Sequence, residues 1–75
     1  MRIISQNGCD FPYEQIAVII DESSIVCRSV SNANGKIWTL GDYSSEERAQ
    51  EVFNEIHDNC ARFDTSAMVF VMPEE

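Results

Sequence analysis

The chain has 75 residues, of which 44% are hydrophobic, and Asp and Glu outnumber Lys and Arg by 13 to 5, which gives a formal net charge of −8. This length allows one domain spanning residues 1–75, and the apolar content is too high for a disordered chain. The negative charge argues against direct binding to nucleic acids or anionic membranes, where Lys and Arg supply most of the affinity, and it favours a basic partner.

The cysteines and the apolar runs indicate the compartment. Cys9, Cys27 and Cys60 are an odd number with no CxxC spacing, which is not a disulfide framework. Met1–Ser5 is not typical of a signal peptide, and the longest apolar run, Ala67–Met72, is far too short to span a bilayer. We therefore expect a cytoplasmic protein.

The first half of the chain predicts short strands separated by turns. Runs rich in β-branched residues predict strands at Arg2–Ser5, Glu14–Ile20, Ser24–Ser31 and Lys36–Leu40. The expected connections are the turn Gln6–Gly8, the irregular segment Asp10–Tyr13, the turn Asp21–Ser23 and the loop Asn32–Gly35. Within that last loop, Asn34-Gly35 is the strongest short hairpin signal.

An amphipathic helix is predicted after Gly41-Asp42-Tyr43. Between Ser44 and Phe63 the apolar residues recur at helical spacing. They are Ala49, Val52, Phe53, Ile56, Cys60 and Phe63. Ser44 and Glu47 fit a capping box with Ser44 as the N-cap. We expect the helix to end near Arg62, followed by a loop at Asp64–Ser66 and a last strand at Ala67–Met72.

The order β-β-β-β-α-β predicts an α+β fold, an antiparallel sheet of four to five strands with one amphipathic helix packed on one face. The strands are apolar on both sides, since Ile16, Val18 and Ile20 alternate with Ala17 and Ile19. One helix covers only one face, so the second face needs another cover. A homodimer or higher homo-oligomer is the simplest way to supply it.

The polar side of the predicted helix carries an acidic stripe. Glu47, Glu51 and Glu55 follow one another at intervals of four residues, with Asp58 on the same side. Each like-charge pair costs roughly 0.2–0.5 kcal/mol, so the stripe does not help the helix itself. One interpretation is a solvated face, relieved in part by Arg48 and Arg62. The other is a partner-binding site in which carboxylates imitate backbone phosphates toward a basic groove.

A second candidate site combines bases with aromatic side chains. Its residues would be Arg28, Trp38, Tyr13 and Tyr43, because a guanidinium beside an indole can hold a nucleotide. Arg28 and Trp38 share a face only if the two strands are joined by an odd-length loop. With a two-residue Asn34-Gly35 turn, Trp38 would lie opposite Ser31 and Arg28 would turn to the other face. The alternative is that Trp38 is a core or interface residue and Arg28 a solvated charge.

Catalytic and metal-binding patterns are weak. His57 and Cys60 are three residues apart on the helix, but Cys9 and Cys27 stand alone, without the paired spacing of zinc ligands. The glycines do not form a phosphate-binding loop. The thirteen acids form no recognisable acid–base pair. We therefore predict a non-enzymatic protein with no metal, no cofactor and no catalytic residues.

Four segments resemble small uncharacterised proteins of Gram-positive phages, prophages and mobile elements. They are Met1–Gly8, Asp10–Glu14, Leu40–Glu47 and Val69–Glu75. These proteins are similar to the Thoeris anti-defence proteins, oligomeric sponges that sequester a cyclic ADP-ribose immune signal. The segment between the helix and the last strand is longer in those sponges than the Phe63–Ser66 present here, so no binding residue is transferred from them.

The resemblance implies a counter-defence role inside the host bacterium, and three hypotheses follow. The first is an acidic inhibitor of a basic host defence protein, comparable to an anti-CRISPR protein, that binds through Glu47, Glu51, Glu55 and Asp58. The second is an oligomeric sponge for a cyclic nucleotide that uses the Arg28 and Trp38 set. The third is a structural accessory protein with no ligand.

Overall fold

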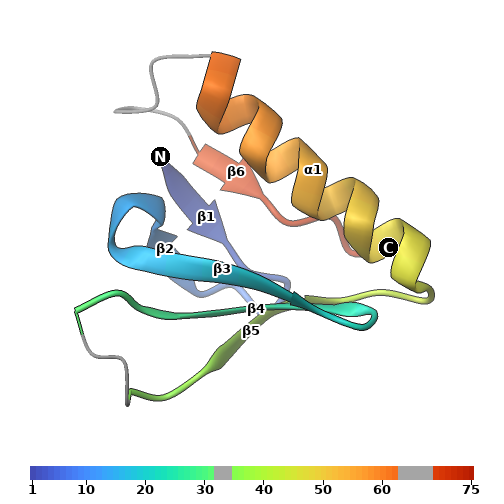
Figure 1. Ribbon diagram of the computed structural model, residues 1–75, viewed down its shortest axis with the longest axis horizontal. Helices are drawn as coiled ribbons and strands as arrows, with labels where there is room; N and C mark the ends of the chain where they lie inside the picture. The colour runs from blue at the N-terminus through green and yellow to red at the C-terminus, as the bar shows by residue number, and fades with distance from the viewer. Residues whose placement is uncertain (32–34, 63–68) are drawn as a thin grey trace.

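The computed structural model describes residues 1–31, 35–62 and 69–75, and the chain has an α+β fold (Figure 1). In chain order its elements are β1 (Arg2–Ile4), β2 (Asp10–Pro12), the single 3₁₀ turn η1 (Tyr13–Gln15), β3 (Ile16–Asp21), β4 (Ser24–Ser29), β5 (Trp38–Asp42), α1 (Glu46–Arg62) and β6 (Val69–Val71). No helix among the described residues is long and apolar enough to cross a membrane.

The strands form two three-stranded sheets, where the sequence predicts one antiparallel sheet of four to five strands. In the β2-β1-β6 sheet, β1 pairs antiparallel with β2 and parallel with β6, whereas the β3-β4-β5 sheet is antiparallel throughout. The prediction was wrong at Asp10–Tyr13, expected to be irregular, because Asp10–Pro12 pairs with β1 and Ile3 lies opposite Phe11. Proline is tolerated there because β2 is an edge strand, where a missing N–H need not break a ladder.

Gln6, in the turn after β1, joins the two sheets. Its side-chain amide donates to the carbonyl of Pro73 at 2.8 Å, and its side-chain oxygen accepts from the N–H of Asp42 at 2.8 Å. Gly41 lies directly against this contact. A Cβ at that position would stand 2.8 Å from Tyr43 Oη and 3.1 Å from Gln6 Cδ, so a side chain there forces its neighbours to move.

Several strand boundaries differ from those predicted. The residues directly before Ile16 form η1, so β3 begins two residues later than predicted. A two-residue turn at Glu22 and Ser23 joins β3 to β4. Glu22 has a φ of 54° in this turn. β5 occupies Trp38–Asp42 where Lys36–Leu40 is predicted. The Asn34-Gly35 turn and the Asp64–Ser66 loop lie partly or wholly outside the described residues.

The helix was predicted well, apart from its first residue. α1 begins at Glu46, so Ser45 occupies the N-cap position that the sequence assigned to Ser44. Ser45 Oγ accepts a hydrogen bond from the N–H of Arg48 at 3.1 Å, which is the bond expected of an N-cap side chain. The residue three positions after the cap is therefore Arg48, which cannot complete the predicted capping box.

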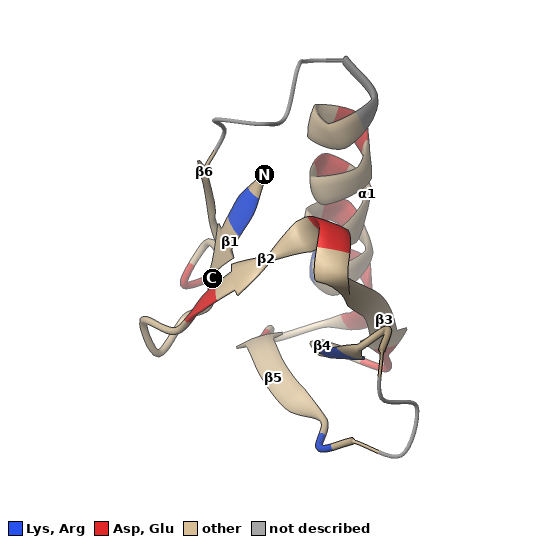
Figure 2. Cartoon of the chain, turned by 90° about the vertical axis from the view of Figure 1, so that its left-hand side faces the viewer, with Lys and Arg blue, Asp and Glu red and all other residues tan. Residues whose placement is uncertain are grey.

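One core lies between α1 and the two sheets. Its fully buried members include Ile3 of β1, Ile25 of β4, Leu40 of β5 and Ile56 of α1. α1 and the β2-β1-β6 sheet lie on the same side of the β3-β4-β5 sheet, and none of the described elements covers the other side (Figure 2). The second sheet therefore covers the same face as the helix, and the outer face of the β3-β4-β5 sheet, for which the sequence predicts cover by another copy, remains open (Figure 2).

Candidate functional site

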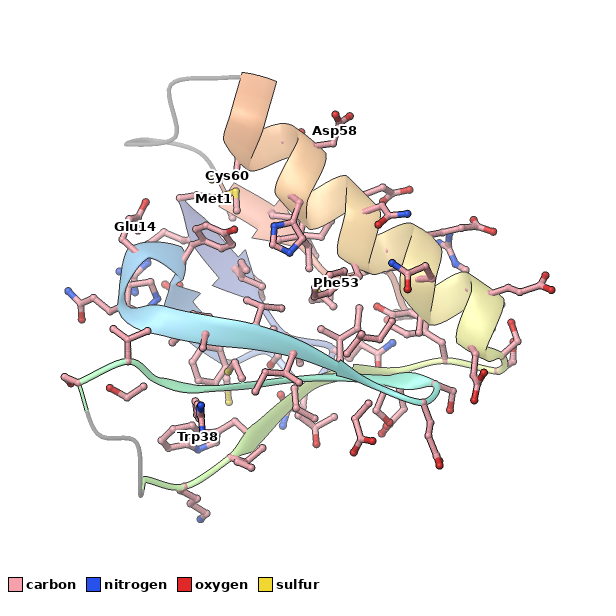
Figure 3. All side chains as sticks on the ribbon, in the orientation of Figure 1. Met1, Glu14, Trp38, Phe53, Asp58 and Cys60 are labelled. Atoms are coloured by element: carbon pink, nitrogen blue, oxygen red, sulfur yellow. The ribbon has the colours of Figure 1, made fainter. Side chains whose placement is uncertain are left out.

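The four acids of the predicted stripe project from the side of α1 opposite the core. Glu47, Glu51, Glu55 and Asp58 are all exposed, whereas Ile56, on the inner side of the same helix, is fully buried. Acidic positions follow α1 along its length in Figure 2, and Asp58 points away from both sheets in Figure 3. We call these four residues the acidic helix face. Their exposure confirms the helical phase read from the sequence.

Part of this face is hollowed. An open depression of about 410 Å³ is lined by Glu51, Asn54, Glu55 and Asp58. Glu47 lies one turn earlier and does not line it. Three of the four predicted partner-binding residues therefore line one shallow, open depression, with an amide side chain among the carboxylates.

The charges of this face are partly neutralised. Arg48 Nη1 lies 3.2 Å from Glu51 Oε2, and Arg48 Nε donates to the backbone carbonyl of Glu75 at 2.9 Å. The predicted relief of Glu51 by Arg48 is confirmed, whereas the Arg62 side chain lies outside the described residues. An exposed pair of this kind contributes little to stability and is screened by salt. The face keeps a strong excess of negative charge.

The second candidate site is not assembled. The β4–β5 register sets Trp38 opposite Cys27, so neighbouring Arg28 points to the other face of the sheet. An even number of residues separates Cys27 from Trp38, which is the case in which Arg28 and Trp38 lie on opposite faces. Trp38 packs instead against Phe11, with ring centroids 5.9 Å apart. The juxtaposition of Arg28 and Trp38 that a nucleotide site needs is therefore absent from the described sheet.

The two tyrosines of that set serve different contacts. Tyr43 is buried and its hydroxyl donates to the carbonyl of Pro73 at 2.9 Å, and burial raises the pKa of Tyr43. Tyr13 Oη lies 3.4 Å from His57 Nδ1 on α1. Burial raises the pKa of Tyr13, and a hydrogen bond with Cys60 adds to the shift. Both tyrosines hold elements of the fold together.

The His57 and Cys60 region is built from packed contacts. The His57 ring stacks edge-on against Phe53, with centroids 4.5 Å apart. Glu14 of η1 forms an ion pair with the amino group of Met1 nearby, and this contact lowers the pKa of Glu14 (Figure 3). Among residues 1–31, 35–62 and 69–75, no three His, Cys, Asp or Glu side chains are arranged to hold a metal ion.

A smaller depression of about 150 Å³ lies beside the Gln6 contact, and none of the predicted site residues lines it. Its lining residues are Gln6, Asn7, Thr39, Leu40, Gly41 and Asp42. Sequence reasoning missed this feature because it depends on contact between the β1–β2 turn and β5, two segments far apart in the chain.

Comparisons of this chain with protein-family models, with curated proteins and with solved structures found no match.

Proposed function

We propose that this protein acts by binding, and that the acidic helix face docks on a basic, nucleic-acid-binding surface of another protein. The observation that supports the proposal is the arrangement of Glu47, Glu51, Glu55 and Asp58, all exposed on the side of α1 opposite the core. The resemblance to phage and mobile-element proteins suggests the partner, a host defence protein in the bacterial cytoplasm. The role is counter-defence by occupation, without catalysis.

The spacing of the carboxylates suits imitation of a phosphate row. Residues 47 and 58 are eleven positions apart, which is about 16 Å along a helix, so the four charges follow one another at about 5.5 Å. Each DNA strand carries one phosphate per roughly 3.4 Å of its axis. The acidic helix face is therefore a sparser row of the same sign. The net charge of −8 adds long-range attraction toward a basic groove.

The test is charge reversal with a matched control. The variant Glu47→Lys/Glu51→Lys/Glu55→Lys reverses three of the four charges of the acidic helix face. The control Glu46→Lys/Glu74→Lys/Glu75→Lys changes the net charge equally at exposed positions outside it. Each protein is used to capture partners from a host that carries the defence system, and the protein and small-molecule fractions are identified by mass spectrometry.

We expect the wild type and the control to retain the same protein partner, and the face variant to bind it at least about tenfold more weakly. Binding of the wild type should also weaken as salt increases, because exposed charges are screened. Equal capture by the face variant and the control, with both folded by circular dichroism, would contradict the proposal.

The cyclic-nucleotide sponge stays a prediction without a supporting site. Arg28 and Trp38 lie on opposite sides of one sheet, Tyr43 is buried against Pro73, and Tyr13 contacts α1. A cyclic nucleotide recovered in the small-molecule fraction, with a thermal shift on adding it back, would favour the sponge over the inhibitor. Recovery of neither class would favour the structural accessory protein.

A further inference from the structure

The outer side of the β3-β4-β5 sheet is apolar and open to solvent. The register places Ala17 beside Arg28, and Ile19 beside Val26 and Thr39, all on the side away from the core. We call these five residues the open sheet face. The exposed side chains Val30 and Ile37 flank it, at 60% and 58% exposure.

This face is unusual for an antiparallel sheet with one solvated side. Such sheets normally alternate apolar residues toward the core with polar residues toward water. Here the inner residues Val18 and Ile20 alternate with outer Ala17 and Ile19, so the strand is apolar on both sides. Contiguous apolar surface on a small soluble domain usually marks a contact with another molecule.

Charges of opposite sign stand at the two ends of the open sheet face. Arg28 lies toward one end, and within the described part of the chain it forms no ion pair. At the other end Asp21 and Asp42 flank Ser24, each directly opposite it in the register. Ser24 and Arg28 are four residues apart on β4, which is about 13 Å, and Val26 lies midway between them.

We propose that the open sheet face binds the same face of a second copy of this chain, around a two-fold axis that passes near Val26. The strands of the two sheets then run in opposite directions. Each Arg28 lies over Asp21 and Asp42 of the other copy, and Val26 and Ile19 form the dry centre. The charge pattern selects a second copy as the occupant, because it becomes complementary when rotated onto itself.

The size of the face sets the strength of the association. Two strands of six residues and one of five span about 14 Å by 20 Å, well below the roughly 800 Å² per partner of a standard interface. Two copies of net charge −8 also repel each other at long range. The dimer is therefore reversible and depends on concentration. It leaves α1 on the far side of each sheet, so this inference does not rest on the acidic helix face.

The experiment is sedimentation equilibrium of the full chain, with four variants. Val26→Lys and Arg28→Asp should each weaken association by at least about tenfold, because one places an unpaired charge in the dry centre and the other sets acid against acid. The swap Arg28→Asp/Asp21→Arg should restore association toward the wild-type value. Glu47→Arg, which makes the same charge change as Asp21→Arg but lies on the acidic helix face, should not weaken it.

Circular dichroism and thermal melting check that each variant is folded, and the swap guards against loss of association through misfolding. A wild type that stays monomeric at every concentration would overturn the proposal. So would a dimer that is indifferent to Val26→Lys and Arg28→Asp, or one that Glu47→Arg disrupts, since the contact would then lie elsewhere.

Discussion

The acidic helix face and the open sheet face are both solvent-facing surfaces of this domain, and they differ in what their exposure means. A surface helix normally turns charged residues outward, so the exposure of Glu51 or Glu55 requires no partner to explain it. A solvated sheet face normally turns polar residues outward, so the exposure of Ile19 and Val30 does require an explanation. The sheet therefore gives stronger evidence of a contact, and the helix gives clearer chemistry for the partner.

The two faces also work together if both proposals hold. The sheet-to-sheet dimer turns its two helices to opposite sides, so one particle presents two acidic helix faces. A partner with two basic grooves, or two partners joined to each other, would then be held by both faces at once. Such double attachment raises the overall affinity without any new contact.

The largest expected effect is the difference in free energy of unfolding between substitutions on the inner and on the outer sides of α1 and β4. Ile56→Ala on α1 and Ile25→Ala on β4 each remove a fully buried side chain and should lower the free energy of unfolding by about 2–5 kcal/mol. Their chain neighbours Glu55→Ala and Val26→Ala lie on the outer sides and should cost about 1 kcal/mol or less. Urea unfolding, at concentrations low enough for a monomer, measures all four.

A Val26→Ala loss as large as that of Ile25→Ala under these conditions would mean that the open sheet face is already covered within one chain. The contrast between the two faces would then fail.

A smaller effect tests where the acidic helix begins. Ser45→Ala removes the N-cap hydrogen bond to the N–H of Arg48 and should cost about 1 kcal/mol. Ser44→Ala lies before the cap and should change stability by less than about 0.5 kcal/mol. Thermal unfolding of the two variants side by side decides between them. The reverse order would restore the start of the helix that the sequence predicts.

The helix was predictable because its evidence is local and repeated. Six apolar residues at helical spacing fix both the type of element and its phase, so the exposure of Glu47, Glu51 and Glu55 followed before any tertiary contact was known. The cap was placed one residue early because Ser44 and Ser45 both suit it. Which serine is used depends on where β5 ends, and β5 runs on to Asp42.

The sheets were less predictable because their pairing is not local. β1, β2 and β6 are three residues long, too short for alternation to reveal a strand, and β6 pairs with β1 from the other end of the chain. The open sheet face was predicted in part, because the sequence of β3 has apolar residues at both inward and outward positions.

The nucleotide site depended on the register between β4 and β5. The register shift between Ile25 and Val26 leaves Leu40 as an extra residue on β5, and Trp38 lies opposite Cys27. Composition cannot determine such a register. Arg28 and Trp38 were grouped on the condition that an odd-length loop joins the two strands, and the sheet does not meet this condition.

The smallest expected effect is a change of stability with pH that comes from Cys27, on the inner side of the β3-β4-β5 sheet. Cys27 is fully buried beside exposed Arg28, and burial raises the pKa of its thiol above the usual 9.0. A group whose pKa is raised in the folded state contributes stability below its unfolded pKa and loses it as pH rises through the folded value. Stability should therefore fall above about pH 9, at no more than about 1.4 kcal/mol per pH unit for this thiol. Urea unfolding from pH 8 to 10 should show a shallower decline for Cys27→Ala than for the wild type. Equal slopes for the wild type and Cys27→Ala would mean that water reaches the inner side of β4, and the division of this sheet into a dry face and an open face would no longer hold.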